Sequence, residues 1–155
     1  MAKDEKVQNN HIKQDPVCVF LRKRGNEMEI GSTYKVEIKV EDKDTAKMVG
    51  SGTLLVLATP RMIALMEEAA YKCIGKELEA GATSVGTLMN VKHLSATPVG
   101  MNIYATATVT EVDGRRVAFK VEAYDEVGII GEGVHERFVV AEERFVAKTY
   151  SKLGK

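Results

Sequence analysis

Apolar and polar residues alternate strictly from Thr33 to Glu41, a pattern that predicts a strand with one buried face. Further apolar patterning predicts four more strands, over residues 84–93, 101–112, 116–124 and 128–140. Short turns join these four strands, which favours an antiparallel meander. The chain thus contains one early strand and a later group of four.

Glycine residues mark the turns and irregularities of this β region. Asp113-Gly114 predicts a two-residue hairpin of type I′ between two of the strands. Gly131 and Gly133 interrupt the last strand, which indicates a bulge or a close approach of another backbone. The polar residues 42–53 predict a loop.

One long helix is predicted between the first strand and the other four. Thr59-Pro60 is a helix-start signal, with Thr59 as the N-cap and Pro60 in the first helical position. We expect the helix to run to about Glu79, with Gly81 as its C-terminal stop. Its first half is apolar nearly all round, which is typical of a buried helix.

This order of elements predicts an α+β fold. Because the helix is apolar on more than one face, we expect the sheet to curl around it and a second subunit to cover what one sheet leaves open. The expected domain spans residues 28–155. Residues 1–27 form an N-terminal extension, for which disorder and a packing role of the apolar run 16–21 both stay open. The charged tail from Ala141 is a candidate helix.

Composition narrows the function classes. The 155 residues carry 22 basic and 22 acidic side chains, and this balance argues against a nucleic-acid binder or a polybasic membrane-surface protein. Two cysteines and three dispersed histidines match neither a disulfide framework nor a zinc pattern. With no apolar run long enough to span a bilayer and no apolar signal region, the reducing cytoplasm is the expected location.

Glu67 is the one charge on an otherwise apolar stripe of the helix formed with Ile63, Ala70 and Ile74. A carboxylate held against an apolar face gains basicity, as a general base or nucleophile requires. The alternative is a salt-bridged Glu at the edge of the stripe. Its neighbour Glu68 is expected to pair with Lys72 in an ordinary surface arrangement.

Two further residues break their local pattern. His93 extends the mainly apolar face expected for Val85, Thr87, Met89 and Val91, and it is either a packing residue or a catalytic one. Thr59 needs no role beyond helix capping, although a helix N-terminus also presents N–H groups that hold an oxyanion.

Glu136 and Cys73 have plain structural interpretations. Glu136 lies between His135 and Arg137 in a group of titratable residues on the last strand, and cross-strand ion pairing is its favoured interpretation. Cys73 is expected in the core.

Four segments, taken in order, resemble a known family: ATPRMIALMEEAA (58–70), SVGTLMNVKHLSATPVG (84–100), VDGRRVAFKVEAYD (112–125) and GEGVHERFVV (131–140). They are similar to hot-dog-fold thioesterases of the fluoroacetyl-CoA thioesterase type, over roughly residues 29–150. The resemblance implies a curved antiparallel sheet wrapped around one long helix. It also implies a homodimer or a dimer of dimers, with the active site at the subunit interface.

The resemblance implies a role for five residues. Thr59, Glu67 and His93 fall on the family's catalytic positions. Gly86 falls on a glycine whose backbone lies beside the thioester, and Arg137 on an arginine that helps to orient the site. The implied substrate is an acyl-CoA, and no metal and no cofactor beyond the substrate's own CoA is required.

The expected function is hydrolysis of a small or medium acyl-CoA to the free acid and CoA. Residues 42–58 are shorter than the aromatic-rich lid of the family's best-known member and contain no Phe, Tyr or Trp, which argues against fluoroacetyl selectivity. One alternative is a non-catalytic acyl-CoA-binding or sensor module on the same fold. Another is an acyl-CoA hydratase, which the absence of a clear Asp/His pair disfavours.

Overall fold

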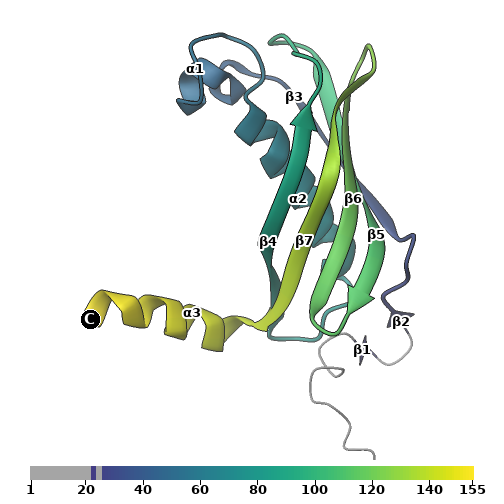
Figure 1. The fold of residues 1–155 in the computed structure, drawn as a ribbon, viewed down its shortest axis with the longest axis vertical. Coiled ribbons are helices and arrows are strands. Elements are labelled where there is room, and N and C mark those ends of the chain that lie inside the picture. Colours follow the sequence, from purple (N-terminus) through teal and green to yellow (C-terminus); the bar gives the residue numbers. More distant parts are fainter. Residues whose placement is uncertain (1–21, 24–25) are drawn as a thin grey trace, which may run out of the picture.

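A computed structural model describes residues 22–23 and 26–155 of the chain (Figure 1). Within the expected N-terminal extension, β1 (Arg22–Lys23) and β2 (Asn26–Glu27) form a short antiparallel pair. The remaining expectations for residues 1–27, including the apolar run 16–21, lie outside the described residues.

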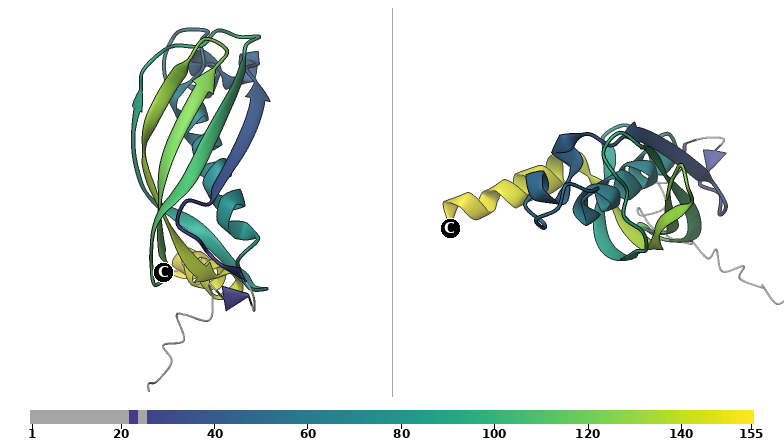
Figure 2. Two further views of the ribbon diagram at one scale, coloured as in Figure 1. Left: turned by 90° about the vertical axis from the view of Figure 1, so that its right-hand side faces the viewer. Right: turned by 90° about the horizontal axis from the view of Figure 1, so that it is seen from above.

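The body of the molecule is a five-stranded antiparallel sheet that curves around one long helix, α2 (Figure 2). This confirms the predicted order of elements. The strands lie in the order β3-β5-β6-β7-β4, so that β3 and β4 form the two edges. Their bounds are β3 Thr33–Lys39, β4 Ala82–His93, β5 Asn102–Asp113, β6 Arg116–Asp125 and β7 Ile129–Ala141.

The core lies between α2 and the concave face of the sheet. The inward-facing side chains of the two central strands are buried, namely Ile103, Ala105, Ala107 and Val109 on β5 and Val117, Phe119, Val121 and Ala123 on β6. Their partners on α2 are Met62, Leu65, Met66, Ala69, Ala70 and Ile74. The apolar side chains that alternate along the strands and those that recur every 3.6 residues along the helix thus form one apolar layer.

Helix α2 spans Thr59–Gly75, shorter at its C-terminus than the predicted end near Glu79. The N-cap is Ala58, not Thr59 as the sequence suggested. The helix is also less buried than expected, because one side of it remains uncovered in the single chain, where Tyr71 is 46% exposed.

The predicted loop at residues 42–53 contains two short helical turns, η2 (Asp42–Asp44) and α1 (Ala46–Val49). Buried Asp44 ties this segment to the start of α2. Its Oδ1 accepts a hydrogen bond from Arg61 Nε at 2.8 Å, and its carbonyl oxygen accepts one from Ala58 N at 2.9 Å. These contacts fix the position of the first turn of α2.

The hairpin between β5 and β6 forms as predicted, but its type differs. Gly114 has a φ of 57°, whereas Arg115 has no positive φ. A positive φ at the first central residue alone is the pattern of type II′ rather than I′.

Both expected features of the β7 glycines are present. The register between β6 and β7 shifts beside Gly131, and a Cβ on Gly131 would lie 2.6 Å from Met62 Sδ. A Cβ on Gly133 would overlap the backbone of Asn90 on β4. The strand therefore needs glycine at both positions to pack as it does.

The predicted C-terminal helix is present as α3 (Glu142–Tyr150), followed by η3 (Ser151–Gly154). No residue of either element is buried, and α3 extends away from the sheet (Figure 1).

Replacement of Gly133 by Ala should destabilise the fold by about 3 kcal/mol, because the new methyl group meets backbone that cannot move aside. The measurement is the free energy of urea unfolding. Gly128→Ala is the matched control, since a Cβ at Gly128 contacts nothing within 4 Å. Equal midpoints for the two variants would contradict the close approach of β4 and β7.

Candidate active site

Thr59 and His93, two of the three residues singled out in the sequence, lie against each other. Thr59 Oγ1 and His93 Nδ1 are 2.7 Å apart, a hydrogen bond whose donor depends on the imidazole tautomer. Thr59 begins α2 and His93 ends β4, so the bond joins the helix N-terminus to an edge strand. Since no side chain caps α2, the Thr59 hydroxyl serves this contact and not the capping role predicted for it.

The environment of His93 favours a neutral imidazole. Burial lowers the pKa of His93 below its ordinary value of 6.5. A neutral imidazole with one nitrogen bound to a hydroxyl can accept or deliver a proton near neutral pH. The pair opens into a cavity of about 570 Å³.

Glu67 lies two turns further along α2, at the border between its packed side and its uncovered side. Its side chain is 44% exposed, so the predicted burial against an apolar face is wrong for the single chain. The reason is that Gly86 and Arg137, at the edge of the sheet, cover only one side of the carboxylate. Glu67 Oε1 lies 4.0 Å from Nη1 of Arg137, and both residues line a separate cavity of about 350 Å³.

Gly86 provides the space that the Glu67 carboxylate occupies. A Cβ on Gly86 would lie 2.5 Å from Glu67 Oε1 and 3.3 Å from Cε1 of His135. The glycine expected beside the reacting group therefore lies directly against a proposed catalytic carboxylate.

A bulge in β4 corrects the predicted face of that strand. The register passes from Gly86↔Arg137 to Leu88↔Glu136, which leaves Thr87 as the extra residue. Strict alternation therefore fails at this point. Met89, Val91 and His93 face α2 as predicted, but they share that face with Gly86 and not with Val85 and Thr87.

Arg137 is buried and held by several contacts. Its Nε donates to Ser84 Oγ at 2.8 Å, and its Nη2 donates to the Ser84 carbonyl oxygen at 2.8 Å. Its Nη1 lies 3.2 Å from His135 Nε2. Burial lowers the pKa of the Arg137 guanidinium, and the Glu67 carboxylate opposes this effect. These contacts fix the guanidinium beside Glu67.

His135 is a site residue that sequence reasoning did not single out. It is fully buried, and its Nδ1 donates to the Leu88 carbonyl oxygen at 2.8 Å. Its Nε2 is then left to accept from Arg137. Burial lowers the pKa of His135, and the Arg137 charge adds to the lowering. The available signal was the i, i+2 spacing of His135 and Arg137, which places both on one face of β7, the face that Gly86 shares on the neighbouring strand β4.

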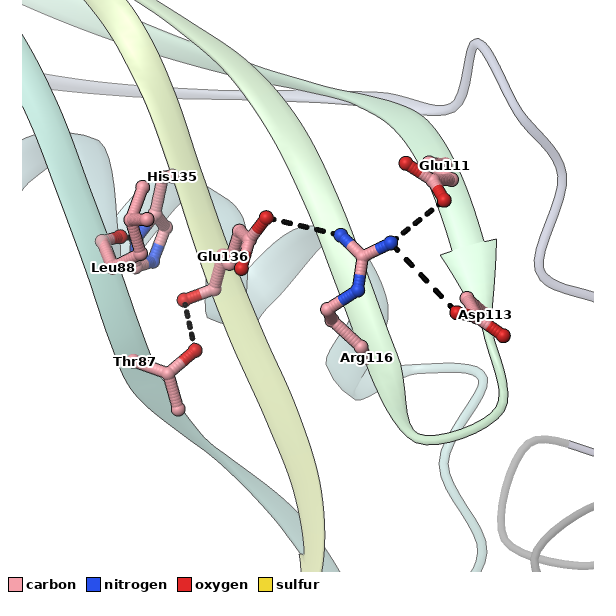
Figure 3. Close-up of polar contacts among 7 residues, drawn as sticks. All are labelled: Thr87, Leu88, Glu111, Asp113, Arg116, His135 and Glu136. Carbon is pink, nitrogen blue, oxygen red and sulfur yellow. Dashed lines mark hydrogen bonds and ion pairs between the residues drawn. The ribbon is translucent and has the colours of Figure 1, made fainter.

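The favoured interpretations of Glu136 and Glu68 are confirmed, whereas Cys73, expected in the core, is only partly buried at its border. Glu136 Oε1 accepts from Arg116 Nη1 at 3.0 Å, and Figure 3 shows this cross-strand pair together with His135 beside Leu88. Lys72 Nζ lies 2.6 Å from Glu68 Oε1. Cys73 packs against the core, with Sγ 3.5 Å from the Ser32 carbonyl oxygen.

One chain thus forms two groups rather than one triad. The first contains Thr59 and His93, and the second contains Glu67, Gly86, Arg137 and the unforeseen His135. Eight residues of helix separate Thr59 from Glu67, which is about 12 Å of axial rise.

Two classes of feature are absent from residues 22–23 and 26–155. That part of the chain contains no group of three His, Cys, Asp or Glu side chains placed to hold a metal ion. None of its helices is long and apolar enough to cross a membrane.

Comparison with protein families matches residues 40–143 to a family described as fluoroacetyl-CoA-specific thioesterase. A protein of Streptantibioticus cattleyicolor named fluoroacetyl-CoA thioesterase is 43% identical over 97 residues, which cover 63% of this chain and 70% of that protein. The range matched to the family includes Thr59, Glu67 and His93.

Solved structures agree with these matches. The structure of a fluoroacetyl-CoA thioesterase superposes with a TM-score of 0.79 at 34% identity, covering 82% of this chain and 98% of the other. A thioesterase-superfamily protein of Thermus thermophilus superposes with a TM-score of 0.75 at 30% identity, covering 83% and 95%. A hot-dog-like protein of Thermanaerovibrio acidaminovorans gives 0.74 at 27% identity, covering 81% and 93%. The expected hot-dog fold is confirmed.

Stability should fall as the pH drops from 7.5 to 5.5. The folded state holds His93 and His135 at pKa values below 6.5, so the unfolded state binds more protons in this range. The free energy of unfolding then rises with pH, by at most about 1.4 kcal/mol per pH unit for each histidine. Urea unfolding at several pH values measures the slope.

His135→Gln should reduce that slope, because glutamine does not titrate. An unchanged slope in this variant would show that His135 is not held neutral by its burial against Arg137.

Proposed function

The chain belongs to the fluoroacetyl-CoA-specific thioesterase family and hydrolyses acyl-CoA thioesters, and we propose that Thr59, Glu67 and His93 perform this hydrolysis. Gly86 and Arg137 bind and orient the groups around them. CoA enters as part of the substrate, and the proposed steps use protein groups and water alone.

The observation that carries this assignment is the hydrogen bond between Thr59 and His93 at the N-terminus of α2. A helix N-terminus presents N–H groups and a positive partial charge. A thioester carbonyl oxygen placed there is stabilised as it becomes an oxyanion. The same position brings the leaving sulfur within reach of an imidazole that is neutral near pH 7.

The chemistry then follows from the two groups of residues. Glu67 either removes a proton from the attacking water or attacks the carbonyl carbon itself, to form an anhydride that water opens. In both routes the C–S bond breaks and CoA leaves as a thiolate, and the thiolate takes a proton that His93 relays from water. Arg137 holds the carboxylate in place, and Gly86 leaves room for it.

We propose that the site is completed in a homodimer, alone or within a dimer of dimers. In one chain Thr59 and His93 lie about two helical turns from Glu67. The uncovered side of α2, which carries Glu67 and Tyr71, and the free edge of β4 are the surfaces available to a second copy. In this arrangement Glu67 of one copy acts on a thioester held at the Thr59–His93 pair of the other.

The two alternative functions are not favoured. A sensor module would leave the Thr59–His93 bond and the space at Gly86 without a role, and relatives named as thioesterases support hydrolysis rather than binding alone or hydration. Selectivity for fluoroacetyl-CoA is a property of the named relatives. Residues 42–58 of this chain contain no aromatic side chain, which argues against the same selectivity in this protein.

Glu67→Gln should lower kcat/KM for every acyl-CoA that the parent protein hydrolyses, by about 100-fold or more. The measurement follows release of free thiol from acetyl-, butyryl-, hexanoyl- and phenylacetyl-CoA. Glu68→Gln is the matched control, because Glu68 pairs with Lys72 and should leave the rate near the parental value.

Two results would count against the assignment. Absence of turnover on the whole panel would contradict the function, and a Glu67→Gln rate equal to the parent's would contradict the role of the carboxylate.

Coexpression of two inactive variants, each with its own affinity tag, tests the shared site. A hybrid dimer of Glu67→Gln with His93→Gln contains one site with both residues intact, so it should recover about half the parental activity. The hybrid of Thr59→Ala with His93→Gln should stay inactive, because these residues belong to the same group. If neither hybrid recovers activity, each site draws all three residues from one chain.

A further inference from the structure

The cavity beside Thr59 and His93 has two walls that are fixed at their base. One wall is the segment from Ala46 to Leu57, and the other is the connection that follows β4, Leu94–Ala96. Leu57 N donates to the Thr97 carbonyl oxygen at 2.9 Å, and both residues are buried. The cavity is therefore closed at the bottom by packed structure and does not need a ligand to form it.

The lining of this cavity combines aliphatic side chains with a few hydroxyl groups. The large aliphatic side chains are Leu54, Val56 and Leu57 from the first wall and Leu94 from the second, and hydroxyl groups come from both walls. Among the lining residues, all of which lie in the described part of the chain, His93 is the only titratable one and none is Phe, Tyr or Trp. The four large aliphatic side chains offer contacts to methylene groups, and the lining contains no Lys, Arg, Asp or Glu to pair with a charged acyl group.

Two of these leucines remain unusually accessible. Leu54 is 66% exposed and Leu94 is 50% exposed, and they come from opposite walls at the mouth of the cavity. Apolar side chains exposed together around a concave site are characteristic of ligand binding. The adjacent pair proposed to act on the thioester indicates the ligand, because an acyl chain is covalently attached to the carbonyl that this pair would hold.

The volume distinguishes between acyl groups. About 570 Å³ lies within the range of small-molecule sites and is several times what a two-carbon acyl group fills. An acetyl or fluoroacetyl group would leave most of the aliphatic lining in contact with water. A longer saturated chain would shield these aliphatic side chains from water, and the favourable binding free energy would increase with each methylene that is buried.

We propose that this cavity receives the acyl chain, and that the preferred substrates are saturated aliphatic acyl-CoA thioesters of about four to eight carbons, with Leu54 and Leu94 as the residues that set chain-length preference. The proposal rests on the proposed function, because it places the thioester carbonyl at Thr59 and His93. It goes further in naming the acyl class and the residues that select it.

The test measures kcat/KM for acetyl-, fluoroacetyl-, butyryl-, hexanoyl- and octanoyl-CoA with the full-length protein. We expect a rise of about fourfold for each added methylene until the cavity is filled. Fluoroacetyl-CoA should be hydrolysed no better than acetyl-CoA beyond the difference in intrinsic thioester reactivity, which alkaline hydrolysis of the two substrates supplies.

Variants locate the effect. Leu54→Ala and Leu94→Ala should each lower kcat/KM for hexanoyl-CoA by about tenfold and leave acetyl-CoA within about twofold. Leu54→Phe should narrow the mouth and move the optimum to shorter chains. Leu153→Ala is the matched control, since Leu153 is a surface leucine of η3 that is 84% exposed.

The outcomes are separable. Hydrolysis of acetyl-CoA with no rise along the series overturns the chain-length proposal and leaves the thioesterase function intact. A change of oligomeric mass in Leu54→Ala, measured by sedimentation, with unchanged chain-length preference would assign the leucines to a subunit contact and also overturn it. No turnover of any substrate overturns both proposals.

Discussion

The close approach of helix α2 to the concave face of the sheet is the constraint on which the rest of the structure depends. Alanines at the contact, among them Ala69 and Ala70 on the helix and Ala105 on β5, keep the two layers near each other. Gly131 permits Met62 to press against β7, where any side chain would collide with its sulfur. The same proximity brings Thr59 to His93 and leaves only a glycine's width between β4 and Glu67. The spacing between α2 and the sheet therefore determines both the packing of the core and the positions of the site residues.

Arg137 shows how a buried charge is stabilised in this layer. Its guanidinium binds Ser84 twice and contacts a histidine that burial keeps neutral, so most of its hydrogen-bonding capacity is satisfied inside the protein. What remains points toward the Glu67 carboxylate. Arg137 restrains the Glu67 carboxylate on the side that faces the sheet, while the other side of the carboxylate stays exposed to solvent. A carboxylate that acts on a bound substrate needs both a fixed position and an accessible face.

Local patterns in the chain predicted most of the fold. The strands, the long helix and the inward faces of β5 and β6 follow from alternation and periodicity, which act over a few residues. The predictions failed where a distant partner decides the outcome. Thr59 has the chemistry of an N-cap, but its hydroxyl binds a histidine 34 positions away. Glu67 lies on an apolar stripe, yet the edge of the sheet covers only one side of its carboxylate. His135 became visible as a site residue only once the register placed it opposite Met89 and beside Gly86.

The bulge at Thr87 has a consequence for how this strand can vary. It is the point where two alternating patterns along β4 meet out of phase, so that Gly86 and His93 face the helix although they stand an odd number of positions apart. Removal of that one residue would leave Gly86 and His93 six positions apart, so a regularly pleated strand would keep Met89, Val91 and His93 on the face toward the helix. An even number of positions between Gly86 and His93 therefore allows a regular strand, whereas an odd number requires a bulge to keep both residues on the inner face.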